Sequence, residues 1–204
     1  MKLSFLGKFK KLYYIIVSAV LLSLLIGCKS SKDNYNETTL EIGKKGHIRE
    51  NIVESFGKEY YSLDELSAEF ENEIEQYNDV IGGQEIKLDR IELKGDELFA
   101  TVEFNGPSDY ESFVGEELFV GSISDAYDNG YSMNVALKGV KEGKVIGKVQ
   151  IMGMKDKNII ILSEPVRVKC FDDIAYVSAN VDVINRNEAR ILSESGGLAY
   201  IVLK

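Results

Sequence analysis

Residues 63–81 carry a helical repeat of apolar side chains, and this repeat constrains the fold more than any other feature. Ser62 and Glu65 form a capping-box pattern before the repeat, and Gly82-Gly83 follows it as a C-terminal stop. The other faces hold seven carboxylates and no lysine or arginine, so packing of the apolar stripe must hold this helix. The stripe, at steps of three and four residues, consists of Leu63, Leu66, Phe70, Ile74, Tyr77 and Ile81.

The rest of the chain favours short strands, because its apolar residues mostly recur at period two. We expect an α+β fold with a mainly antiparallel sheet of short strands, one long amphipathic helix at about 63–81, and one or two short helices. The short helices are predicted at 109–114, capped by Ser108, and at 124–129, while 146–154 is ambiguous. Strands are predicted at 40–42, 48–56 (with room for a bulge), 86–93, 99–104, 118–123, 133–140, 158–162 (central), 166–170, 174–178, 181–184, 189–192 and 198–203.

The first residues have the pattern of a secretory leader. Four lysines, at positions 2, 8, 10 and 11, precede an almost uninterrupted apolar run over 12–26. A spanning helix needs roughly twenty apolar residues, and this run ends earlier, at Gly27. The pattern predicts a signal peptide over residues 1–27; the alternative is an uncleaved signal anchor with an incidental cysteine.

Leu25-Ile26-Gly27-Cys28 follows this run directly and resembles the lipobox of bacterial lipoproteins. The resemblance implies cleavage before Cys28, diacylglycerol on its sulfur with palmitate-type acyl chains, and a domain held on the extracytoplasmic face of the cell membrane. Two acyl chains suffice for stable anchoring. The polar residues 28–38 then read as a lipidated cysteine with a flexible tether, and residues 39–204 as a single extracytoplasmic domain.

Charge and cysteine content exclude several classes of protein. Removal of residues 1–27 takes away four lysines and no carboxylate, so the formal net charge would change from −9 to −13. Such a charge argues against nucleic acid and against an anionic lipid surface as partners. With Cys28 lipidated, Cys170 has no partner for a disulfide, and we interpret it as a buried core residue rather than a reactive thiol.

The sequence is poor in catalytic patterns, and we expect a protein that is not an enzyme and that has no cofactor, catalytic residue or metal site. The only histidine, His47, follows a glycine-rich turn, which favours a surface position. A weak calcium-loop pattern at 125–130 lacks the closing glutamate. Carboxylates that could act in pairs, or simply be solvated, are Glu116 with Glu117, Asp125 with Asp128, and Asp172 with Asp173.

Further stretches resemble uncharacterised surface lipoproteins of clostridial type, over most of the mature domain. These stretches are 60–66 (YYSLDEL), 73–78 (EIEQYN), 118–121 (LFVG) and 197–202 (GLAYIV). The resemblance implies a location at the cell surface and no particular activity. Tyrosines in or near expected loops either form a recognition surface or cap the edge of the core; they are Tyr60, Tyr61, Tyr110, Tyr127 and Tyr131.

These observations favour a membrane-anchored binding or envelope-structural module with a protein or cell-envelope partner. One alternative is a small-ligand or cation-binding lipoprotein that serves a transporter or sensor. Another is a carboxylate-based hydrolase, which would need an Asp or Glu with a raised pKa in a cleft. Among individual residues, only Cys28 has an assigned role, as the site of lipid attachment.

Overall fold

The protein contains both helices and sheets, and its strand pairs are mostly antiparallel. The computed structural model describes residues 35–56, 62–192 and 197–204. The expected signal peptide, Cys28 and most of the tether lie outside these residues. The chain forms two compact units: unit 1 combines the residues up to Thr38 with 51–102, and unit 2 combines 39–50 with 103–204. The single domain expected over 39–204 remains a prediction, since β2 and β4 belong in part to each unit.

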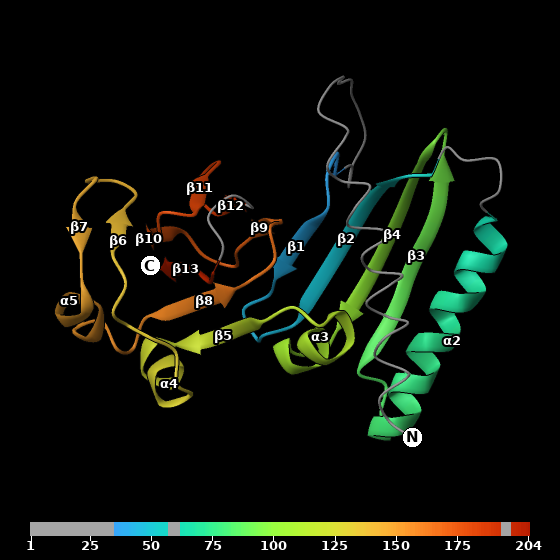
Figure 1. The fold of residues 1–204 in the computed structure, drawn as a ribbon, viewed down its shortest axis with the longest axis horizontal. Helices are drawn as coiled ribbons and strands as arrows, with labels where there is room; N and C mark the ends of the chain where they lie inside the picture. The colour runs from blue at the N-terminus through green and yellow to red at the C-terminus, as the bar shows by residue number, and fades with distance from the viewer. Residues whose placement is uncertain (1–34, 57–61, 193–196) are drawn as a thin grey trace. The chain divides into compact units, whose positions relative to one another are not determined.

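Unit 1 is built around the long helix predicted from the apolar repeat. Its elements are α2 (Leu63–Ile81), β3 (Ile86–Lys94), and parts of β2 (Ile48–Ser55) and β4 (Glu97–Phe104). The Ser62 side chain accepts a hydrogen bond from the Glu65 amide, and Gly82 ends the helix with a left-handed φ of 77°. The predicted bounds of α2 are therefore confirmed, and Figure 1 shows the helix alongside β3.

The apolar stripe of α2 is only shallowly covered in the described residues. Ile74 and Asn78 are the buried residues of the helix, and Leu66, Phe70 and Tyr77 are half-buried. Val80 and Ile81, at the end of the helix, remain 85% and 53% exposed. The helix is thus held mainly by its middle and by the contacts around Asn78.

Unit 2 contains a sheet in which the first hairpin joins strands from the end of the chain. The hairpin is confirmed, with its turn closed by Gly46 at a φ of 82°. β1 and β9 pair in parallel, with Leu40 opposite Val168, whereas the other pairs of known register among the described residues are antiparallel. In unit 2 the order is β11-β12-β9-β1-β2-β4, which includes β1 (Thr39–Ile42), β9 (Arg167–Lys169), β11 (Val181–Val183) and β12 (Glu188–Ile191).

A second sheet lies wholly within unit 2, in the order β5-β8-β13-β10-β6-β7. β8 pairs with β5 on one side and β13 on the other, so the central position predicted for the apolar run at 158–162 is confirmed. All residues of β13 are buried. The strands are β5 (Leu118–Ser122), β6 (Leu137–Gly139), β7 (Val145–Ile146), β8 (Asn158–Leu162), β10 (Ile174–Val177) and β13 (Ala199–Leu203).

The short helices correct several expectations. Three occur among the described residues, not one or two: α3 (Pro107–Val114), α4 (Ile123–Asp128) and α5 (Lys148–Met152). The N-cap of α3 is Gly106, not Ser108, because Pro107 already occupies the first turn. The helix predicted at 124–129 is α4, which begins one residue earlier and has Ser122 as its N-cap. The ambiguous segment 146–154 contains α5.

One strand prediction also changes. The strand expected at 133–140 shortens to β6, because Met133 and Val135 pack into a core cluster without joining a ladder. In β2, burial alternates at Ile48, Arg49 and Glu50 and is then interrupted, because Asn51 is buried as well; the bulge allowed there stays a prediction. The alternation at 48–50 carries a carboxylate, Glu50, into the interior.

Candidate functional site

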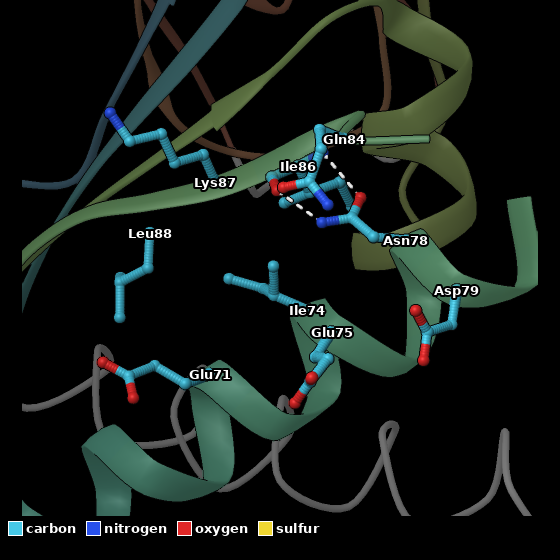
Figure 2. Close-up of a pocket in the computed structure, with 9 residues that line it drawn as sticks. All are labelled: Glu71, Ile74, Glu75, Asn78, Asp79, Gln84, Ile86, Lys87 and Leu88. Atoms are coloured by element: carbon cyan, nitrogen blue, oxygen red, sulfur yellow. Dashed lines mark hydrogen bonds between the residues drawn. The ribbon is translucent and has the colours of Figure 1, made fainter. Parts of the chain in front are cut away.

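One candidate site is an open hollow of about 350 Å³ between α2 and β3 in unit 1. Ile74 and Ile86 form its base but are buried, and Leu88 is half-buried. Figure 2 shows Glu71, Glu75 and Asp79 spaced along α2, with Gln84 and Lys87 on the segment that follows. The hollow therefore offers a shallow, mostly polar surface bordered by a row of carboxylates.

The row of Glu71, Glu75 and Asp79, called the acidic row below, follows from a spacing of four residues. Successive members lie about one helical turn apart, or roughly 6 Å. No group of three or more His, Cys, Asp or Glu side chains in the described ranges could hold a metal ion. The acidic row is thus too spread out to enclose one small cation, and its spacing suits several positive charges in series.

Asn78 fixes the geometry of this hollow from below. Its side-chain amide donates to the Ile86 carbonyl at 2.8 Å, and its side-chain oxygen accepts from the amides of Glu85 and Ile86 at 2.9 and 3.0 Å. Its backbone carbonyl accepts from Gly82 and Gly83 at the helix end. One buried residue, drawn in Figure 2, therefore joins the end of α2 to the start of β3.

Nearby carboxylates of unit 1 have perturbed acidity without lining the hollow. Burial, together with repulsion from Glu69, raises the pKa of Glu73 to about 7. Burial alone raises the pKa of Glu54 to about 7. Neither residue lines either of the two hollows described here. These shifts reflect partial burial along α2 and β2, and they do not bring a proton donor to an accessible cleft.

A buried carboxylate pair lies inside unit 2. Glu50 on β2 and Glu164 after β8 are 6% and 8% exposed, and Tyr110 on α3 donates a hydrogen bond to a Glu164 carboxyl oxygen. Burial and repulsion from Glu164 raise the pKa of Glu50 well above its usual range. The Tyr110 ring packs edge-on against Phe104 at 5.3 Å between centroids. The pair is a polar centre within an aromatic part of the core and lines neither hollow.

Cys170 and His47 lie around the second hollow, of about 300 Å³ in unit 2. Cys170 is buried, as expected, and burial with the charge of Glu188 raises the pKa of its thiol to about 12. His47 is exposed, also as expected. Two ion pairs border the hollow, Arg49 with Glu103 at 2.9 Å and Lys169 with Glu41 at 3.7 Å.

Among the carboxylates considered as possible pairs, several have structural partners in the folded protein. Glu116 accepts a hydrogen bond from the Ser163 hydroxyl at 2.8 Å, and the backbone amide of Glu117 donates to the same hydroxyl oxygen. Asp125 accepts from Ser122 as part of the α4 capping box. Asp173 pairs with Arg186 and Lys204 at 2.7 and 2.5 Å.

The tyrosines separate into different environments. Tyr110 is buried on α3, so it packs in the core and does not belong to an exposed recognition surface. Tyr127 is exposed, and Tyr131 packs against Phe119 at 5.0 Å between ring centroids. Burial and the charges of Glu117 and Glu111 raise the pKa of Tyr131 to about 12. Tyr60 and Tyr61 lie outside the described residues, as does Cys28.

Sequence reasoning missed Asn78, Glu50 and Glu164. The sequence contained a signal for Glu50. It lies two residues after the apolar Ile48, and side chains two residues apart in a strand point to the same face. Asn78 falls among the apolar positions of α2, one residue after Tyr77, but an asparagine near a helix end gives no sign of the strand it joins.

Comparisons with known proteins identify no relative: no protein-family model, no curated protein and no solved structure matches this chain. Within the described residues, no helix has the length and apolar character needed to cross a membrane.

Proposed function

We propose that the protein is an extracytoplasmic lipoprotein, anchored to the cell membrane through diacylglycerol on Cys28, and that its folded part binds a protein or cell-envelope partner. The leader and the lipobox pattern at 25–28 support the anchor. The acidic row beside an open hollow is the observation that supports binding. The partner is a basic segment of another protein.

The chemistry of the hollow suits such a segment. An extended or helical peptide can place lysines or arginines at intervals of about 6 Å, which matches the turns of α2. Its apolar side chains can contact the half-buried Leu88, whereas Ile74 and Ile86 are already covered. This proposal also uses α2 as an amphipathic helix, three of whose seven carboxylates, the acidic row, face a cationic partner.

A binding role fits the described residues better than catalysis does. A carboxylate-based hydrolase needs an accessible acid with a raised pKa, but Glu50 and Glu164 are buried. A thiol nucleophile needs a lowered pKa, but burial raises the pKa of Cys170. The acidic row also suits a small organic polycation, which is the second candidate function. In thermal-shift assays, spermidine would stabilise the protein if this candidate were correct.

Metabolic labelling with a fatty-acid analogue tests the anchor. We expect the wild-type chain to take up the label and Cys28→Ser to lose it completely, because the thioether needs the sulfur. Cys170→Ala is the matched control, since it removes the other cysteine of the sequence and should keep the label. Equal labelling of Cys28→Ser and wild type would contradict the anchor.

Binding of a pentalysine peptide tests the acidic row. We expect the triple variant Glu71→Gln/Glu75→Gln/Asp79→Asn to bind roughly tenfold more weakly, since exposed ion pairs contribute about 0.2–1 kcal/mol each. Added salt should weaken wild-type binding in the same direction.

The control for this experiment is Asp64→Asn/Glu69→Gln/Glu97→Gln, which removes the same charge from exposed positions that do not line the hollow. Calorimetry on the full chain should show near-wild-type affinity for this control. Equal losses in both triple variants would point to general charge attraction and would overturn the hollow as the binding site.

A further inference from the structure

The lysines of this acidic protein are concentrated in one stretch of unit 2. Residues 137–157 contain six lysines and two carboxylates, although the whole chain has a net charge of −9. All six lysines are exposed. They lie on and around β6, β7 and α5, which Figure 1 shows together at one end of unit 2. The stretch is thus a local positive region that total charge conceals.

The same region exposes large apolar side chains. Val149 on α5 is 83% exposed, Val145 on β7 is 61% exposed, and Val140 in the intervening turn is 40% exposed. Scattered exposed valines are common, but three within ten residues form an unusual concentration. Buried Ile146 and Ile151 hold the two elements to the core, so the exposed valines are presented on fixed backbone.

The local geometry places charge and apolar surface side by side. Lys138 and Val145 are direct cross-strand partners, so their side chains share one face of the β6–β7 hairpin. Lys148 lies over the exposed Tyr127 ring, 5.6 Å from its centroid, and adjoins Val149 in the chain. We call this surface the lysine–valine patch; it consists of Lys138, Val140, Lys144, Val145, Lys148 and Val149.

We propose that the lysine–valine patch docks on anionic phospholipid headgroups of the membrane in which Cys28 is anchored. This inference rests on the proposed lipid anchor. Lysines attract the negative surface of such a membrane, and exposed valines can enter the boundary between headgroups and acyl chains. Because the anchor already holds the protein at the bilayer, the patch binds at high effective concentration and needs little intrinsic affinity.

Carboxylates near the patch leave its positive character in place. Asp125 is engaged in the α4 capping box. Asp173 is paired with Lys204 and Arg186, which together with the more distant Lys141 lower its pKa. Glu142 and Asp156 are exposed within the stretch, and Asp128 ends α4. Over residues 137–157 as a whole, six lysines face two carboxylates, so the stretch keeps a net positive charge.

A bilayer fits the patch better than a nucleic acid does. A long polyanion would also meet the acidic faces of this chain, whereas a flat surface meets only the side turned towards it. The exposed valines give apolar contacts that phosphate backbones do not reward. The negative total charge therefore orients the protein on the membrane, with the patch directed towards the headgroups.

A single tryptophan tests this proposal directly, because the chain contains none. Val149→Trp is introduced into the full lipoprotein, whose lipidation is verified by mass spectrometry, and the protein is reconstituted in vesicles that contain brominated phosphatidylcholine. We expect strong quenching when phosphatidylglycerol is present and weak quenching in phosphatidylcholine alone. Val80→Trp is the matched control, since Val80 is 85% exposed on the acidic helix α2 and should stay unquenched.

Lysine variants supply the second measurement. In the Val149→Trp background, Lys144→Gln/Lys148→Gln should reduce the ratio of docked to undocked protein roughly thirtyfold, as expected for two lysines near an anionic surface. Quenching that is equal in both lipids, or equal at positions 80 and 149, would overturn the proposal. A concentration-dependent blue shift in detergent without vesicles would assign the patch to self-association instead. Absence of the lipid in the mass spectrum would refute the anchor separately.

Discussion

Replacing Asn78 by alanine is expected to lower the free energy of unfolding of unit 1 by about 2–3 kcal/mol. The substitution removes one donor and one acceptor that serve three backbone groups at the start of β3. Buried polar groups left without partners cost about 1–3 kcal/mol each. Alanine has the better helix propensity, which offsets about 0.7 kcal/mol of the loss. The loss dominates because Asn78 is only 5% exposed and water cannot replace it.

Urea titration and amide hydrogen exchange measure this effect. Exchange at Glu85 and Ile86 should accelerate most, because their amides donate to the Asn78 side chain. Asp79→Ala, the neighbouring substitution at an exposed position of the same helix, is the control and should change stability by less than about 0.5 kcal/mol. Near-equal effects of the two substitutions would show that the hydrogen bonds of Asn78 do not hold α2 to β3.

Asn78→Asp separates the two roles of this side chain. Aspartate keeps acceptors for the Glu85 and Ile86 amides but, when ionised, cannot donate to the Ile86 carbonyl. Protonation at low pH restores a donor, so we expect Asn78→Asp to regain stability relative to wild type as the pH falls. Asn78→Ala has no such group, and its deficit should stay constant with pH.

Local patterns predicted well those elements whose signals lie within the element itself. The apolar repeat and both caps of α2 are short-range features, and the structure reproduces its predicted bounds. The glycine-rich turn before Ile48 is also a local signal, and the hairpin predicted from it is confirmed. The helix α5 escaped prediction because it is short, with a glycine at each end and one buried residue, Ile151.

Features that depend on long-range contacts could not be predicted in this way. The parallel pairing of β1 with β9 joins residues more than a hundred positions apart, and neither strand encodes its partner. The hollow beside α2 depends on how β3 returns along the helix. The lysine–valine patch was hidden by composition, because a total charge describes the whole chain and not the distribution of charge over its surface.

Glu50→Gln is expected to make unit 2 more stable at neutral pH and to flatten its dependence on pH. Burial and Glu164 raise the pKa of Glu50 in the folded state, so the folded protein holds this proton while the unfolded chain releases it. The stability contributed by protonated Glu50 is therefore complete below about pH 4.3, the usual carboxyl value. It declines as the pH rises, at up to about 1.4 kcal/mol per pH unit, until Glu50 ionises in the folded state.

Glutamine has the same shape and remains neutral, so Glu50→Gln should match wild type near pH 4 and exceed it increasingly towards pH 8. Urea titrations across this range, followed by tyrosine fluorescence, measure the difference. Glu142→Gln, at an exposed turn of the same unit, is the control and should leave the slope unchanged.

Tyr110→Phe tests the other half of the pair, because it removes the hydrogen bond to Glu164 while keeping the ring packed against Phe104. Because this change removes a hydrogen bond to a buried carboxyl oxygen, we expect Tyr110→Phe to lower the free energy of unfolding of unit 2 by about 1–3 kcal/mol. A Glu50→Gln protein that follows the wild-type curve at every pH would show that Glu50 ionises in the folded protein as readily as in the unfolded chain.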